Sequence, residues 1–121
     1  MAKVLIIEDE EALRTVYCMI LEAAGYTVSQ ASDGQEGLKQ LLSFLPDLIL
    51  LDTLMPVKNG LEFLHEANMK RDYPKTTVII LSNLSDSPTI KEALKLGAAK
   101  HLIKANTLPR DLLAVIKTYC A

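Results

Sequence analysis

The chain is 121 residues long, half of them hydrophobic and 5% aromatic, and its formal net charge at pH 7 is −2; this length fits a single domain, residues 1–121. A nucleic-acid surface normally shows a strongly basic balance, so we expect this chain to bind no nucleic acid directly. Two widely separated cysteines exclude a disulfide framework or a zinc site, and no apolar run approaches the ~20 residues of a membrane span, which favours a cytoplasmic protein without membrane contact.

Five short apolar runs alternate with helical patterns along the chain. They predict strands at residues 4–7, 27–30, 48–51, 77–81 and 101–103. The first, third and fourth runs lack polar alternation, which is typical of strands covered on both faces in a parallel sheet. The second run is half polar and is interpreted as an edge strand.

The first two predicted helices have clear boundaries. Apolar residues fall at i, i+3, i+4, i+7, i+8 and i+11 from Leu13, which is one continuous stripe. Gly25 follows as the stop of this helix. The second helix opens with Asp33, which has a glutamate three residues on, and Pro46 ends it.

Three further helices complete the alternation. One runs from about Leu61 past Ala67, the next starts at Ser87 with a proline at its first helical position, and the last begins near residues 107–109 and buries Tyr119 on its apolar face. Five βα units predict an α/β fold with five helices, a doubly wound parallel sheet whose common strand order is 2-1-3-4-5.

Polar residues interrupt the apolar runs where the strands end. Glu8 and Asp9 follow the first strand and Asp52 follows the third. Ser82 follows the fourth strand and Lys104 the fifth. Parallel strands place their carboxyl ends on one edge of the sheet, and ligands bind there beside the point where the strand order reverses. We therefore expect three carboxylates, a hydroxyl and an ammonium to converge on one cleft.

The chemistry of this cluster points to phosphoryl transfer. Three carboxylates would repel one another unless a cation joined them. Hard carboxylate oxygens suit Mg²⁺, and the lack of imidazole and thiolate disfavours zinc. A carboxylate nucleophile, a divalent metal and a lysine are the parts that phosphoryl transfer needs.

With these residues in place, the sequence resembles the receiver domain of two-component response regulators, of the single-domain chemotaxis-regulator type. The similarity covers residues 3–119 and rests on the runs 4–10 and 47–56, on Asn59-Gly60-Leu61, on Ser82, and on the stretch 97–99 that leads to Lys104. The resemblance implies a flavodoxin-like fold and a role in phosphorelay signal transduction.

The resemblance also implies the metal and the phosphoryl donor. Asp52 would accept the phosphoryl group from a phosphohistidine on a sensor histidine kinase or a histidine phosphotransfer protein. Asp9 would ligate Mg²⁺ directly and Glu8 would help through water, while Asp52 and the backbone carbonyl of Leu54 would be further ligands.

The remaining matches imply how the state of the site is passed on. Ser82 and Lys104 would bind phosphoryl oxygens, and Ser82 would move as a switch together with the residue at His101. The fourth helix, fifth strand and fifth helix would form the surface for an unidentified downstream protein. Self-catalysed phosphotransfer and self-dephosphorylation would be the only catalysis, so the chain would not be an enzyme.

Several positions depart from the family pattern. Ala105 stands where a proline with a cis bond is usual, and because a cis bond before a non-proline residue costs about 2.5–4 kcal/mol, we expect a trans bond. His101 replaces the usual Tyr or Phe and permits a pH influence, while Asn83 follows the switch hydroxyl. The resemblance implies that the positions of Leu54 and Leu84 flank the path of the hydrolytic water; leucine offers that water no hydrogen bond, which predicts slow dephosphorylation.

Two other functions stay open from the sequence alone. A magnesium-dependent phosphohydrolase that turns over through an aspartyl phosphate would use similar groups, although the stretch Asp52-Thr53-Leu54 lacks the second acid of such enzymes. A degenerate receiver that serves as a phosphorylation-independent scaffold is the other alternative, which Ala105 and His101 keep open.

Overall fold

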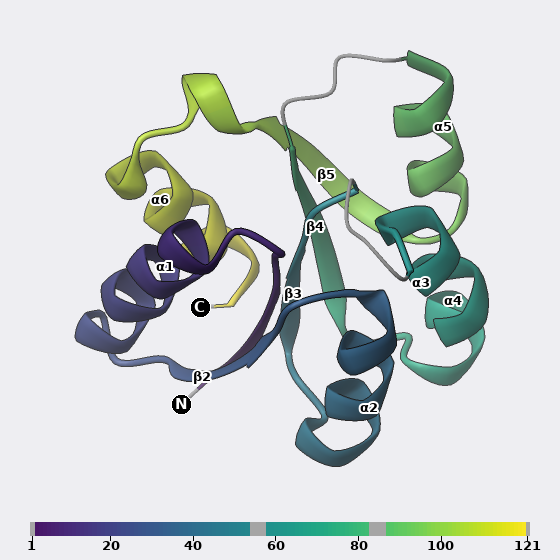
Figure 1. The fold of residues 1–121 in the computed structure, drawn as a ribbon, viewed down its shortest axis with the longest axis horizontal. Helices are drawn as coiled ribbons and strands as arrows, with labels where there is room; N and C mark the ends of the chain where they lie inside the picture. Colours follow the sequence, from purple (N-terminus) through teal and green to yellow (C-terminus); the bar gives the residue numbers. More distant parts are fainter. Residues whose placement is uncertain (1, 54–57, 83–86, 121) are drawn as a thin grey trace.

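Five parallel strands form the centre of the molecule (Figure 1). This computed structural model describes residues 2–53, 58–82 and 87–120. The strand order is β2-β1-β3-β4-β5, which confirms the predicted sheet. The strands are β1 (Lys3–Ile7), β2 (Thr27–Ala31), β3 (Leu48–Leu51), β4 (Thr77–Ser82) and β5 (Ala98–Ile103).

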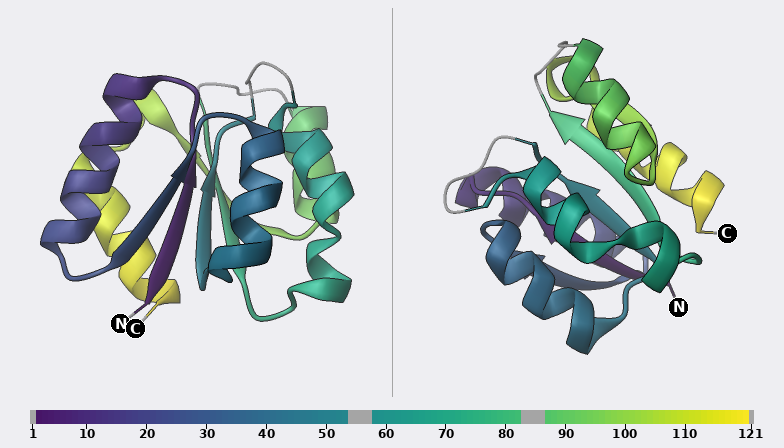
Figure 2. Two further views of the ribbon diagram at one scale, coloured as in Figure 1. Left: turned by 60° about the horizontal axis from the view of Figure 1, so that its bottom comes forward. Right: turned by 90° about the vertical axis from the view of Figure 1, so that its right-hand side faces the viewer.

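Helices cover both faces of the sheet (Figure 2). The helices α1 (Glu11–Ala23) and α6 (Pro109–Tyr119) lie on one face. The other face is covered by α2 (Gly34–Phe44), α3 (Gly60–Ala67), α4 (Met69–Asp72) and α5 (Ser87–Lys95). In the part of the chain that the structure describes, no helix is long and apolar enough to cross a membrane.

The three central strands are apolar because both of their faces are covered. Successive side chains of a strand point to opposite faces. Thus Leu48 and Leu50 of β3 pack against α1 and α6, while Ile49 and Leu51 pack against the other helices. All four are at most 2% exposed. In contrast, β2 pairs only with β1 and has exposed and half-buried residues, which confirms it as an edge strand.

Some predicted boundaries were wrong. The prediction of five helices misses α4, because Asn68 takes a left-handed conformation with φ of 53° and breaks the third helix before a four-residue turn of helix follows. Strand β5 begins at Ala98 rather than at 101, directly after Gly97, whose φ is 113°. Tyr119 is 41% exposed and Val16, within the stripe of the first helix, is 45% exposed. In each of these two helices, the apolar stripe is wider than the part of the helix surface that packs against the sheet. Apolar residues outside that contact stay partly exposed.

Candidate functional site

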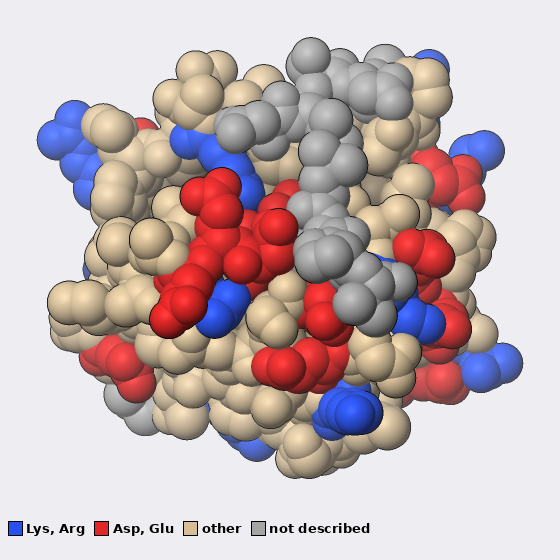
Figure 3. Space-filling model, in the orientation of Figure 1, with Lys and Arg blue, Asp and Glu red and all other residues tan. Residues whose placement is uncertain are grey.

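The acidic residues predicted from the sequence meet where β1 and β3 end. Ile7 of β1 is paired with Leu51 of β3, so the next residues, Glu8 and Asp52, leave the sheet side by side. One carboxylate oxygen from each of Glu8, Asp9 and Asp52 lies within 4.8 Å of the others. Glu8 and Asp52 are buried and Asp9 is exposed. In the view of Figure 3, the side chains of aspartate and glutamate, shown in red, gather near the centre of the surface.

Lys104 completes the cluster from the end of β5. Its Nζ atom lies 2.5 Å from Oε1 of Glu8 and 3.2 Å from Oδ2 of Asp52. The lysine side chain is only 11% exposed, so both ion pairs lie away from bulk water. The convergence of carboxylates and ammonium that the sequence predicted is therefore confirmed.

Charge in the cluster is unbalanced. Burial raises the pKa of Glu8 to about 7, and the charge of Asp52 adds to this effect, while Lys104 opposes it. Burial lowers the pKa of Lys104, but the carboxylates of Glu8 and Asp52 outweigh burial and hold that pKa above its usual value. The Lys104 ammonium thus pairs with two of the three clustered carboxyl groups, and a divalent cation would relieve the repulsion among all three. Oxygen-only donors fit Mg²⁺.

Hydrogen bonds to Glu8 and Glu10 hold the turn between β1 and α1. The Glu8 backbone N–H donates to the Ala31 carbonyl of β2 at 3.0 Å. The Glu10 backbone N–H donates to Oε2 of Glu8 at 3.2 Å. Arg14 donates from Nη1 to the Glu8 carbonyl oxygen at 2.8 Å. The sequence does not predict the Arg14 contact, because its acceptor is a backbone carbonyl oxygen that any residue type would supply.

Gly60, in the sequence motif Asn59-Gly60-Leu61, allows α3 to pack directly against the backbone of Asp52. A Cβ atom on Gly60 would lie 2.5 Å from the Asp52 carbonyl oxygen and 2.8 Å from Cα of Thr53, so only glycine fits here. Asn59 caps the start of α3 reciprocally with Glu62. The backbone N–H of Asn59 donates to the Glu62 side chain, and the backbone N–H of Glu62 donates to the Asn59 side chain, both at 3.0 Å.

Ser82 and His101 lie next to each other on β4 and β5. Ser82 is buried, and its Oγ is 3.5 Å from Nε2 of His101. His101 is half-buried, and burial lowers its pKa. The bond between Lys104 and Ala105 is trans, as expected, and the chain continues there into a short 3-10 helix, Lys104–Asn106. The predictions for the Leu54 carbonyl, Asn83 and Leu84 fall outside the described residues.

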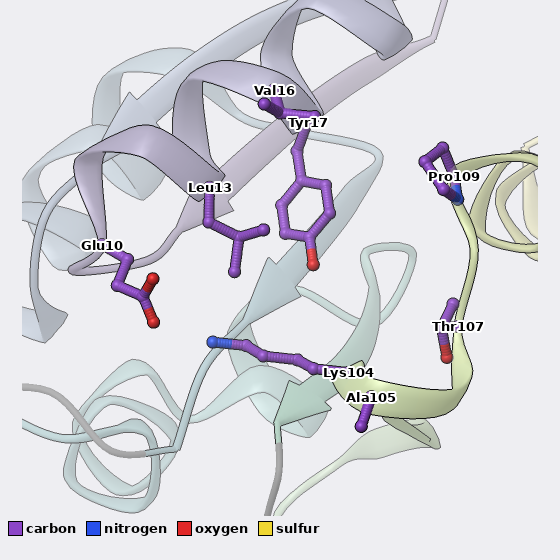
Figure 4. A pocket seen from close by; sticks show the side chains of 8 residues that line it. All are labelled: Glu10, Leu13, Val16, Tyr17, Lys104, Ala105, Thr107 and Pro109. Atoms are coloured by element: carbon purple, nitrogen blue, oxygen red, sulfur yellow. The ribbon is translucent and has the colours of Figure 1, made fainter.

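A pocket of about 290 Å³ opens beside the cluster, between α1 and the segment that joins β5 to α6. Lys104 extends along it toward Glu10, and the ring of Tyr17 enters it from α1 (Figure 4). Leu13, Val16 and other apolar groups line the rest of it. The pocket therefore offers an apolar surface directly next to the charged site.

Comparisons with known proteins identify the family of this chain. Residues 4–117 match the family model of the response regulator receiver domain. The response regulator RR06 of Streptococcus pneumoniae serotype 2 is 38% identical over 114 residues, which are 94% of this chain and 49% of that protein. The phosphate regulon transcriptional regulatory protein PhoB of Escherichia coli K12 is 33% identical over 118 residues, which are 95% of this chain and 50% of that protein. The chain thus spans about half the length of these relatives.

Solved structures extend the likeness to the whole fold. The chemotaxis protein CheY4 of Vibrio cholerae superimposes with a TM-score of 0.89 at 32% identity over 98% of both chains. A CheY-like receiver domain protein from Methanospirillum hungatei JF-1 gives a TM-score of 0.90 at 30% identity, over 98% of this chain and 92% of the other. On the match of residues 4–117, the chain belongs to the response regulator receiver domain family.

Proposed function

We propose that this chain accepts a phosphoryl group on Asp52 from a phosphohistidine donor, with Mg²⁺, and thereby changes its affinity for a partner protein. One observation supports this most strongly. The Lys104 ammonium lies 3.2 Å from the Asp52 carboxylate at the edge of a cluster of three acids. The candidates for the nucleophile, for the cation that binds the phosphoryl oxygens and for the metal ligands therefore lie together at one edge of the sheet.

The proposed reaction uses these groups as follows. A carboxylate oxygen of Asp52 attacks the phosphorus of the phosphohistidine; the P–N bond breaks, and the imidazole leaves with the electron pair. Lys104, already beside Asp52, offers its charge to the incoming phosphoryl oxygens, and the Ser82 hydroxyl donates to one of them. Asp9 and Asp52 would hold Mg²⁺ directly, with Glu8 acting through water. The bound ion would neutralise charge on the transferred group.

The position of the site indicates where the proposed partners would bind. The donor, a sensor histidine kinase or a histidine phosphotransfer protein, must reach Asp52 at this edge, where Val16 of α1 is 45% exposed beside the pocket. The downstream partner would bind the surface of α5, β5 and α6. His101 on β5 contacts Ser82. A movement of Ser82 toward the phosphoryl group would therefore alter the packing of His101 at that surface.

Intact-mass measurement tests the proposal. Incubation with Mg²⁺ and acetyl phosphate should add one phosphoryl group to the wild-type chain and none to Asp52→Asn, because the amide is a poor nucleophile. Chelation of Mg²⁺ should suppress the addition. Catalytic turnover of unrelated phosphate esters would favour the phosphohydrolase instead, and a folded protein that takes no phosphoryl group under any condition would favour the scaffold.

We also expect slow loss of the phosphoryl group. In receiver domains the positions that Leu54 and Leu84 occupy in the sequence flank the path of the hydrolytic water, and a leucine side chain offers that water no hydrogen bond. The decay of the phosphorylated mass in Mg²⁺, after removal of acetyl phosphate and without a phosphatase, measures this rate. A rate at the fast end of the family range would contradict the expectation.

A further inference from the structure

Arg14 links the turn that carries the metal ligands to two secondary-structure elements. It belongs to α1, and its Nη1 donates to the Glu8 carbonyl oxygen at 2.8 Å. Its Nε lies 3.3 Å from Oε1 of Gln30 on β2 and donates to it. Its backbone N–H donates to the carbonyl of Glu10 at 2.9 Å. The side chain is therefore held at both ends of its guanidinium.

The carbonyl that Arg14 contacts belongs to the peptide unit between Glu8 and Asp9. This unit joins two of the three carboxylate residues of the cluster. It also lies just beyond the last residue of β1, Ile7, where the strand ladder has ended. A carbonyl in such a place needs another donor. The Arg14 contact supplies one and fixes the plane of the peptide from which both side chains extend.

In the part of the chain that the structure describes, the Arg14 guanidinium forms no ion pair with a carboxylate. Among the described residues, the ion pairs of the cluster involve Lys104 and not Arg14, although three acids lie in the turn that Arg14 holds. The contact is a charge-assisted hydrogen bond to backbone, which is stronger than a neutral one. The geometry therefore suits orientation of the turn rather than neutralisation of its acids.

We propose that Arg14 is a positioning residue for the divalent cation, acting through the Glu8–Asp9 peptide. The inference rests on the proposed magnesium site. Groups that orient metal ligands without touching the metal typically affect metal affinity by about 10–100-fold. Loss of the Arg14 contact would let the peptide plane rotate, so that Glu8 and Asp9 spend less time in the arrangement that binds the ion.

Charge and position make opposite predictions for this residue. Arg14 repels a cation electrostatically, so removal of its charge alone would strengthen Mg²⁺ binding. Removal of a positioning contact would weaken Mg²⁺ binding. Arg14→Met keeps the length of the side chain and loses both donors and charge, whereas Arg14→Lys keeps the charge with a single donor. The direction of the change in affinity therefore separates the two roles.

Titration of the chain with MgCl₂ by isothermal calorimetry tests the inference. We expect Arg14→Met to weaken binding about tenfold, and Arg14→Lys to fall between it and wild type. Arg110→Met, which removes an exposed arginine from α6, serves as the charge control and should bind like wild type. Should Arg14→Met fail to fold, Gln30→Glu keeps an acceptor for Arg14 while Gln30→Ala removes this second anchor, and both variants lose the hydrogen bond from Gln30 to Sγ of Cys18. Gln30→Ala should then bind Mg²⁺ about twofold more weakly than Gln30→Glu, a lesser effect than full loss of the Arg14 contact.

The outcomes separate the two proposals. Unchanged or tighter binding by a folded Arg14→Met, or by Gln30→Ala relative to Gln30→Glu where Arg14→Met does not fold, would overturn the positioning role and leave the magnesium site intact. Absence of Mg²⁺ binding in the wild-type chain would overturn the magnesium site itself, and the positioning role with it.

Discussion

Replacement of Lys104 by methionine is expected to lower the free energy of unfolding by about 3–5 kcal/mol at pH 8 without Mg²⁺, because loss of one partner of a buried ion pair leaves uncompensated charge. The ammonium contacts Glu8 and Asp52, whose side chains are 3% and 7% exposed. Two buried carboxylates would then face each other without a counter-ion. Urea unfolding followed by circular dichroism measures the loss.

The same variant should show a steeper pH dependence. The pKa of Glu8 is already raised to about 7, chiefly by burial, and Lys104 holds it down. A carboxyl group whose pKa is higher in the folded than in the unfolded state lowers stability as it ionises. Loss of Lys104 should raise the folded pKa of Glu8 further. The loss of stability relative to wild type should therefore be small near pH 5 and should grow as the pH rises past about 7, where Glu8 ionises in the wild type, and Mg²⁺ should restore part of it.

Lys100→Met is the matched control, because Lys100 is an exposed lysine of β5. We expect it to change stability by no more than about 0.5 kcal/mol, as surface substitutions usually do. An equal and pH-independent effect of the two variants would contradict the assignment of Lys104 as the counter-ion of the cluster.

Replacement of Glu8 by glutamine is expected to stabilise the metal-free chain by about 1–3 kcal/mol at pH 8, since one pKa unit corresponds to about 1.4 kcal/mol. The folded pKa of Glu8, about 7, lies above the ordinary value of 4.5. The cost of ionising this carboxyl is thus absent below the ordinary value, grows between the two values and is complete above the folded one. Wild type and Glu8→Gln should therefore have similar stability near pH 5.

Magnesium should reduce this advantage. A ligand at ten times its dissociation constant stabilises the folded state by about 1.4 kcal/mol, and the wild type should gain more from Mg²⁺ than Glu8→Gln. Asp9→Asn provides a comparison, because Asp9 is exposed and its loss should relieve little repulsion in the absence of metal. A metal-free Glu8→Gln less stable than wild type at pH 8 would show that the Lys104 contact outweighs the cost of burying this carboxylate.

The sheet and most of the site were predictable because buried parallel strands have a simple pattern. Continuous apolar runs mark the central strands β1, β3 and β4, and the runs of β1 and β3 are followed directly by the acidic residues Glu8 and Asp52. Since all parallel strands end on one edge, residues 44 positions apart, Glu8 and Asp52, could be placed together from the sequence. The same reasoning brought Lys104 to them, as the structure confirms.

Contacts to the backbone were not predictable in this way. Arg14 binds a carbonyl oxygen, and any residue type at Glu8 would supply that acceptor, so no pattern of side chains reveals the contact. The break at Asn68 depends on a left-handed conformation that asparagine tolerates but does not require. The approach of α3 to Asp52 depends on Gly60, whose need for space appears only when two backbones meet.

Location of the phosphoryl group tests the central claim most directly. The chain is incubated with Mg²⁺ and acetyl phosphate, digested under conditions that preserve acyl phosphates, and sequenced by tandem mass spectrometry. We expect one phosphoryl group on the side chain of Asp52, and none when Mg²⁺ is chelated. A modification at any other residue, or an unmodified Asp52 in a folded chain that binds Mg²⁺, would contradict it.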